Sequence, residues 1–217
     1  MSARPATPAT LAVRQARDFL FDHATDYAGA VDGFRWPVLD EFNFALEWFD
    51  VVTGEHPDRA AVTIVSADLS ARSWSYGELS RRSDQVANWL LSLGLDRGSH
   101  VIVMLNNTIE LWELVLAIYK IGAVAIPTST LLSAADLAYR VEHGEARAVV
   151  LPTSLQARTE LLPSGVLRIG VGAGLPSGWI SWDGSTRPSD RFTPDGPTPA
   201  DDLNLLYFTS GTTARPK

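Results

Sequence analysis

The sequence predicts an α/β fold in which a largely parallel sheet carries helices on both faces. Apolar runs of strand length alternate with helical patterns along the middle of the chain, in the order strand 101–105, helix 109–121, strand 123–126, helix 133–143 and strand 147–151. Strands that are apolar throughout are typical of sheets buried on both faces. Parallel strands also need a connection of helix length, and the helical patterns provide it.

The region before this block predicts a hairpin and a well-capped helix. Residues 60–65 and 73–76 are rich in β-forming residues and are separated by a polar turn, so we expect them to pair. Ser75 and Glu78 have the spacing of a capping box, and Gly94 stands where a glycine would end the helix. The apolar residues of this helix fall on one face, at Leu79, Val86, Leu90 and Leu93.

Closer to the N-terminus the sequence predicts two further helices. The first is a surface helix over residues 11–23. Asn43 caps the second, and its apolar residues Ala45, Leu46 and Phe49 would face one side.

After the central block the composition turns to Gly, Pro and Ser. Strand-like pieces stand at 166–171 and 179–182, and we expect a long surface loop to continue through Pro199. In the central block, Gly122 and Gly144 are expected to end the two helices.

Composition favours a globular protein with small-molecule partners. The chain of 217 residues is 46% hydrophobic and 20% charged, enough to bury the core of one or two domains. Its formal charge of −7, without a basic run, argues against a nucleic-acid partner. We see no signal peptide and no apolar run of membrane-spanning length, so we expect a cytoplasmic protein without a membrane span.

The carboxylates, histidines and thiols suggest no catalytic or metal site. Glu110 and Glu113 lie one helical turn apart, and we expect both on a solvated face. The histidines, at positions 23, 56, 100 and 143, have no metal-ligand spacing and are expected at the surface or at helix ends. The chain has no cysteine, so it has neither a disulfide nor a thiolate nucleophile. We therefore assign no catalytic residue and no metal ligand.

Residues 205–217 predict a strand that leads into a phosphate-binding loop. The apolar and aromatic start of this segment favours a strand, and hydroxyl residues then surround Gly211. Backbone N–H groups and hydroxyls over 209–213 can converge on phosphate oxygens, and Lys217 adds a positive charge. The alternative from the residues alone is a Ser/Thr/Gly surface turn before Pro216.

This run resembles the phosphate loop of the adenylate-forming superfamily, which contains acyl-CoA synthetases, adenylation domains of peptide synthetases and luciferases. The resemblance rests on the residues Thr209, Ser210, Gly211, Thr212, Thr213, Pro216 and Lys217. Ala214 departs from the pattern, since the family usually has glycine there. If that position needs a positive φ, alanine adds strain of about 1 kcal/mol.

Two weaker resemblances support the first. The run Phe42-Asn43-Phe44-Ala45 resembles the start of medium-chain acyl-CoA synthetases, although an ordinary aromatic-faced helix would also explain it. Residues 122–128 resemble a strand-and-turn landmark of the superfamily.

The resemblance implies an acid–thiol ligase that activates a carboxylic acid, fatty or aromatic, as an acyl-adenylate and transfers it to coenzyme A. It implies ATP, Mg²⁺ and coenzyme A as ligands, and the β- and γ-phosphates would bind Thr209, Ser210, Gly211, Thr212, Thr213 and Lys217. The resemblance also implies that residues 1–40 form an N-terminal extension. Residues 41–217 would then be the first part of an AMP-binding domain, without the family's mobile C-terminal domain.

We expect the chain by itself to be inactive and to bind ATP weakly, because the family's other nucleotide-binding motifs are not in it. Self-association is expected through apolar surface that the rest of the domain would cover. Two alternatives stay open. One is an amino-acid adenylation domain of a peptide synthetase, and the other is a non-catalytic binding module with the same scaffold.

Overall fold

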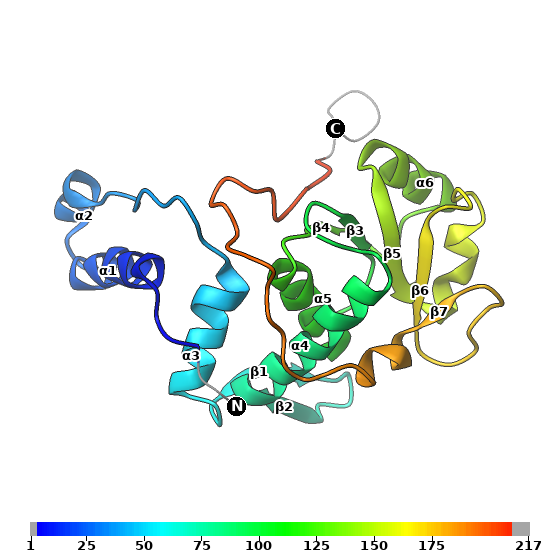
Figure 1. Cartoon of the computed structure of the whole chain (residues 1–217), viewed down its shortest axis with the longest axis horizontal. Helices are drawn as coiled ribbons and strands as arrows, with labels where there is room; N and C mark the ends of the chain where they lie inside the picture. Colours follow the sequence, from blue (N-terminus) through cyan, green and yellow to red (C-terminus); the bar gives the residue numbers. More distant parts are fainter. Residues whose placement is uncertain (1–3, 210–217) are drawn as a thin grey trace.

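The computed structural model describes residues 4–209, and its centre is a five-stranded parallel sheet with the order β4-β3-β5-β6-β7 (Figure 1). The strands are β3 (His100–Val103), β4 (Val124–Pro127), β5 (Ala146–Pro152), β6 (Leu167–Val171) and β7 (Ile180–Ser181). The chain passes from β3 to β4 on one side and then crosses back to β5 on the other. The predicted α/β class is confirmed.

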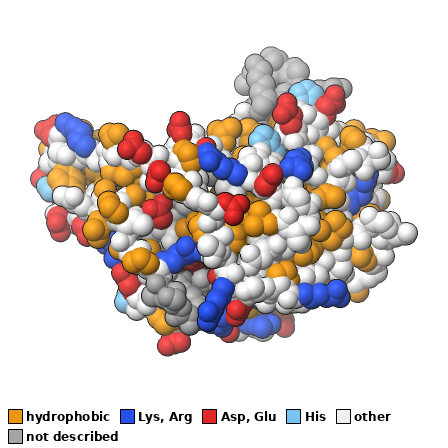
Figure 2. Space-filling model, viewed as in Figure 1, with side chains coloured by type: hydrophobic (Ala, Val, Ile, Leu, Met, Phe, Trp, Pro, Cys, Tyr) orange, Lys and Arg blue, Asp and Glu red, His pale blue; other side chains and the backbone are white. Residues whose placement is uncertain are grey.

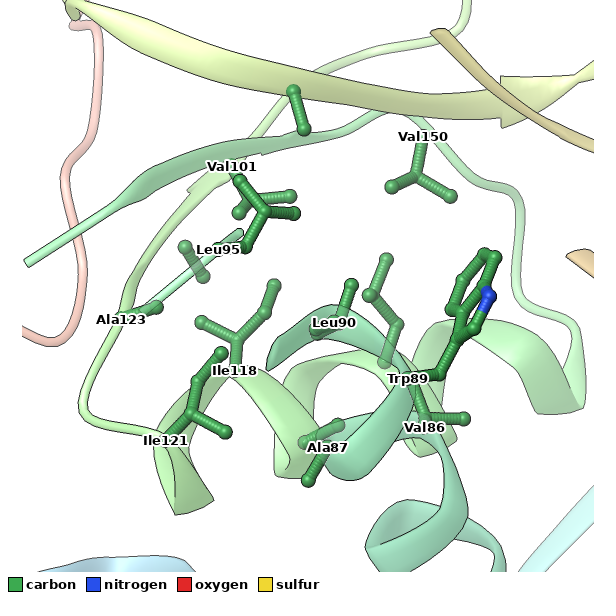
Figure 3. Packing of buried hydrophobic residues seen from close by; sticks show 14 of the residues in the cluster. Val86, Ala87, Trp89, Leu90, Leu95, Val101, Ile118, Ile121, Ala123 and Val150 are labelled. Atoms are coloured by element: carbon green, nitrogen blue, oxygen red, sulfur yellow. The ribbon is translucent and has the colours of Figure 1, made fainter. Parts of the chain in front are cut away.

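Helices cover both faces of the sheet, as predicted. On one face lie α4 (Tyr76–Ser92) and α5 (Ile109–Lys120), and on the other lie α6 (Ala134–His143) and the short helix η2 (Thr153–Thr159). Val101 of β3 belongs to the same buried cluster as Leu90 and Ile118, and Figure 3 shows these side chains pointing together. The next residue, Ile102, packs in the cluster of Leu137 on the opposite face. Complete burial of each such side chain contributes about 2 kcal/mol.

The local signals that begin and end the helices act as predicted. Ser75 and Glu78 form a reciprocal capping box at the start of α4, and Ser133 forms another at the start of α6. Gly94 and Gly122 follow the ends of α4 and α5 with φ values of +78° and +68°, which favour glycine.

The end of α6 differs slightly. Gly144 caps this helix with a negative φ, and the left-handed residue is its successor Glu145.

The predicted hairpin is present as a separate two-stranded antiparallel sheet. Its strands are β1 (Ala60–Val65) and β2 (Ala71–Ser75). The second strand leads directly into α4, so the hairpin is fixed to the helix that covers the large sheet.

The N-terminal helices lie at one end of the molecule, away from the large sheet (Figure 1). They are α1 (Pro8–Asp22), which was predicted, and α2 (Tyr27–Gly33), which was not. Thr10 of α1 is fully buried and donates a hydrogen bond to the carbonyl of Glu47. Phe21 and Tyr27 are largely exposed, and Figure 2 shows apolar side chains on the surface of this part.

Asn43 caps the next helix as predicted, although that helix begins as a single π-helical segment, η1 (Phe44–Phe49), before α3 (Asp50–Glu55). Near the other end of the chain, β7 leads into the short helix η3 (Trp182–Thr186). Between residues 4 and 209, no helix has both the length and the apolar character needed to cross a membrane.

The predicted solvated position of Glu113 is wrong. This side chain is buried between α5 and α4, where Arg82 forms an ion pair with it. Burial raises the pKa of the Glu113 carboxyl, and the Arg82 guanidinium opposes that rise. One turn earlier, Glu110 is only half-buried. The sequence alone predicts a solvated position because it does not show that α4 brings Arg82 to Glu113.

Candidate functional site

Of the predicted phosphate-binding residues, only Thr209 belongs to the part that the structure describes, and it is exposed. Ser210, Gly211, Thr212, Thr213 and Lys217 lie outside the described residues, as does Ala214. The structure does show how the chain arrives at this loop. We call residues 198–209 the approach segment.

The approach segment joins the large sheet beside β4. The amide of Ala125 donates to the carbonyl of Asn204 at 3.0 Å, and the amide of Leu206 donates to the carbonyl of Ala125 at 2.9 Å. This is one parallel bridge between Ala125 and Leu205. It places the segment next to β4, at the free edge of the five-stranded sheet.

The strand predicted from Leu205 onward is therefore reduced to a single bridge. The amide and carbonyl of Ala125 face the approach segment, so the next residue of β4 to face it is Pro127. Proline has no N–H to donate, and the ladder cannot continue there. The predicted start at Leu205 agrees with the bridge, but the predicted strand length is wrong.

Side chains of the approach segment still continue the two faces of the sheet. Leu205 packs against the cluster under α4 and α5, whereas Leu206 and Phe208 pack against the cluster under α6. The ring of Phe208 lies edge-on to Tyr139 at 6.3 Å, and the guanidinium of Arg140 lies over it at 5.4 Å. The last turn of α6 thus fixes the residue before Thr209 and places a cation beside it.

An ion pair holds the middle of the approach segment. Arg97, in the loop after α4, donates to both carboxylate oxygens of Asp202, at 2.6 and 2.8 Å. This pairing holds the pKa of Asp202 below its ordinary value. The Arg97 stem lies across Gly122, where an added Cβ would come within 3.1 Å of Arg97 Cγ.

Asn43 holds the beginning of the approach segment. Its Oδ1 accepts hydrogen bonds from the amides of Ala45 and Leu46, which is the predicted cap. Its Nδ2 donates to the carbonyl of Tyr119 at 2.7 Å and to Oγ1 of Thr198 at 2.9 Å. The side chain is buried, and all four of its hydrogen-bonding positions are used.

Two cavities flank the chain where the approach segment begins. One of about 540 Å³ lies between residues 192–199 and the ends of α4 and α5, and one of about 360 Å³ lies between residues 194–198 and the N-terminal residues Arg4 to Thr7. Neither cavity is lined by a residue from 200 to 209. Both cavities include Thr198, the first residue of the approach segment.

A buried charge cluster borders the larger cavity. The Lys120 ammonium contacts Asp84 Oδ1 at 2.6 Å and Asp50 Oδ1 at 2.9 Å, and Asp50 also binds Arg4. Burial raises the pKa of Asp84, and the charge of Asp50 adds to this rise against the opposing effect of Lys120. The cluster joins α3, α4, α5 and the N-terminal residues.

Among the described residues 4–209, no group of three His, Asp or Glu side chains could hold a metal ion.

The loops after β3 and β4 contact each other through a hydrogen bond from Thr130 to Asn106 at 3.1 Å. These loops are at the carboxyl edge of the sheet, where α/β proteins commonly bind ligands.

A family model described as "AMP-binding enzyme" matches residues 49–217, well over half of the chain. The chain belongs to the AMP-binding enzyme family. It is similar to the acyl-coenzyme A synthetase ACSM5 of Mus musculus, with 30% identity over 84% of this chain and 33% of that protein. It is 34% identical to the uncharacterized acyl-CoA ligase YtcI of Bacillus subtilis, over 67% of this chain and 27% of that protein.

A solved structure, the acyl-CoA synthetase of Brucella canis, aligns with a TM-score of 0.74 and 26% identity over 82% of this chain and 32% of that one. The chain thus spans about a third or less of the length of these relatives. Over the aligned residues, this member of the AMP-binding enzyme family has the same α/β fold as that structure.

Sequence reasoning missed two contacts of the approach segment. Asn43 was predicted only as a helix cap, and its bond to Thr198 joins residues far apart in the sequence. Arg97 was not singled out, because its partner Asp202 lies 105 residues further along the chain. The acidic pair at 201–202 was a signal that a cation could be near, but it did not indicate which one.

Proposed function

We propose that the intact AMP-binding enzyme containing this chain is an acid–thiol ligase. It would join a carboxylic acid to ATP with release of pyrophosphate, and then transfer the acyl group from AMP to coenzyme A. A carboxylate oxygen attacks the α-phosphorus, the bond between the α-phosphorus and the bridging oxygen breaks, and pyrophosphate leaves. In the second step the thiol attacks the acyl carbon, loses its proton and displaces AMP.

One observation carries this proposal. The segment that enters the loop of 209–217 bridges to β4 of a parallel sheet, and the family match extends over that whole region. Loops of hydroxyl and glycine residues that follow a sheet strand present backbone N–H groups to phosphates. The similarity to acyl-CoA synthetases favours an acid and coenzyme A over the other substrates that the superfamily uses.

The roles of individual residues follow from their chemistry. Thr209, Ser210, Thr212 and Thr213 would donate hydroxyl or amide hydrogen bonds to the β- and γ-phosphates, and Gly211 would let the backbone approach them. Lys217 would neutralise charge on the departing pyrophosphate. Bound Mg²⁺ would neutralise further phosphate charge, and we assign no residue of 4–209 to hold it.

The substrate and the location are finer parts of the proposal. A fatty or aromatic acid fits the medium-chain resemblance of Phe42-Asn43-Phe44-Ala45, and we keep the cytoplasm as the expected compartment. An amino-acid adenylation domain is the competing enzyme. Its carrier-protein acceptor would replace coenzyme A in the second step.

The test is ATP–pyrophosphate exchange, measured on the longest product of the gene and separately on the 217-residue chain. Short, medium-chain and aromatic acids are compared with a set of amino acids, and coenzyme A is then added to follow thioester formation. We expect exchange with at least one acid other than an amino acid in a gene product that extends beyond residue 217, and none in the 217-residue chain. Exchange with amino acids only would favour the adenylation-domain alternative, and no exchange with any acid would favour a binding module.

A further inference from the structure

We propose that Arg97 and the Asn43–Thr198 pair are positioning residues that hold the approach segment, and so set the position of Thr209, the first residue of the predicted phosphate loop. This inference rests on the proposed function, because it assigns those contacts to nucleotide binding. It concerns residues that do not touch the nucleotide themselves. Their effect would pass along the approach segment to Thr209.

The approach segment is tied to three different elements at successive points. Thr198 is held from the η1 side, where the Asn43 side chain binds its hydroxyl and the Phe42 amide donates to its carbonyl at 2.9 Å. Asp202 is held by Arg97, from the loop between α4 and β3. The bridge to Ala125 of β4 then follows directly.

Apolar burial does little for the segment between Thr198 and the bridge, where Leu203 is 64% exposed. The apolar side chains that do pack against the sheet, Leu205, Leu206 and Phe208, begin only at the bridge. Segments with few buried apolar contacts open at low free energy, so polar ties decide how much of the time they stay in place. The Asp202 tie is only two residues before the first hydrogen bond to β4 and is therefore best placed to hold that bridge in register.

The fold is arranged so that Arg97 can reach its partner. Gly122 has a positive φ, and its lack of a side chain lets the Arg97 stem lie across the end of α5. The fork of the guanidinium then matches both oxygens of the carboxylate, a geometry that lysine cannot reproduce. Asn43 is likewise specific, since a shorter capping residue would keep the helix cap but would not span to both Tyr119 and Thr198.

The chain offers a matched control for each contact. Arg147 is 54% exposed, close to the 56% of Arg97, and it binds Asp96 beside Arg97, so it tests the same loop without touching the approach segment. Thr193 is exposed and precedes Thr198 in the same stretch, so Thr193→Val controls for Thr198→Val.

Two readouts are measured on the longest product of the gene. The first is amide hydrogen exchange in peptides that cover 203–209, where we expect exchange about two- to fivefold faster in Arg97→Ala than in Arg147→Ala, as loss of an exposed ion pair implies. The second is ATP–pyrophosphate exchange, where we expect a higher KM for Mg-ATP and an unchanged KM for the acid. Thr198→Val should act in the same direction, and Thr193→Val should not.

Two further variants separate positioning from general damage. Arg97→Lys keeps the charge without the fork and should fall between wild type and Arg97→Ala. The double variant Arg97→Asp with Asp202→Arg exchanges the two charged partners. It should restore part of the protection of residues 203–209 against amide hydrogen exchange. If Arg97→Ala and Arg147→Ala behave alike in both readouts, the inference is overturned. If the wild type shows no pyrophosphate exchange with any acid, the proposed function fails, and the amide exchange alone decides whether Arg97 holds the segment.

Discussion

Arg82 on α4 contacts both carboxylate oxygens of Glu113 on α5, with Nε to Oε1 at 3.2 Å and Nη2 to Oε2 at 3.0 Å. The Glu113 side chain is only 8% exposed, so water can replace little of this interaction. We expect Glu113→Gln to lower the free energy of unfolding by about 1 to 3 kcal/mol, because the partly buried Arg82 guanidinium loses its charged partner. Urea denaturation monitored by tryptophan fluorescence measures this.

The control for that substitution is Glu110→Gln, one turn earlier on the same helix. Glu110 is half-buried and stands in the first turn of α5, where a negative charge contributes less than about 1 kcal/mol. If both variants lost the same unfolding free energy, the contact between Arg82 and Glu113 would contribute no stability of its own.

Because of Asp84, which is paired with Lys120, we expect the stability of the chain to depend on pH. Burial raises the pKa of Asp84 above its ordinary value. Between the ordinary and the raised value, folded Asp84 keeps a proton that the unfolded chain has lost, so the free energy of unfolding falls as pH rises through this window. Asp84→Asn should remove that part of the slope, as measured by urea denaturation from about pH 4 to about pH 7.

Asp68 provides a control, because its pKa is shifted in the opposite direction from that of Asp84. Hydrogen bonds from Ser70 lower the pKa of this exposed carboxyl. Its contribution to stability is present above the unfolded pKa and is lost as pH falls through the folded one. An Asp68→Asn variant that changes the slope in the same sense as Asp84→Asn would contradict this assignment.

Gly122→Ala should destabilise the chain more than Gly98→Ala. Both glycines have a positive φ, +68° and +76°, so each substitution costs about 1 kcal/mol of backbone strain. Only at Gly122 would the new methyl group also press on the Arg97 stem, because no atom lies within 4 Å of a Cβ at Gly98. The difference between their unfolding free energies, from thermal or urea denaturation, isolates this contact, and no difference would mean that Arg97 moves aside freely.

Lys217→Ala in the longest product of the gene should slow adenylate formation more than it weakens binding of the acid. The ammonium group would meet charge that grows on pyrophosphate as it leaves, so its contribution belongs to the transition state. Rates of ATP–pyrophosphate exchange and the KM for the acid separate the two effects. A variant that exchanges at the wild-type rate would remove Lys217 from the proposed site.

The sequence by itself determined the α/β class, the hairpin and the ends of the main helices. These features depend on local rules: the period of apolar residues, the capping box at Ser75, and glycines such as Gly94 that accept a positive φ. Each rule works within about one helical turn, so a single sequence displays it. The phosphate-loop assignment also came from the sequence, since it depends on neighbouring residues, and it stays a prediction for all of Thr209 to Lys217.

Only the tertiary structure decided which distant residues meet. Glu113 is buried in an ion pair because α4 places Arg82 beside it. Asp202 forms its ion pair with Arg97, a residue 105 positions earlier in the chain. The strand before the loop shortened to one bridge because the pairing with Ala125 brings Pro127 into the next position. In each case the amino acids were visible in the sequence, but the side they would face depends on how helices and strands pack, which no local pattern contains.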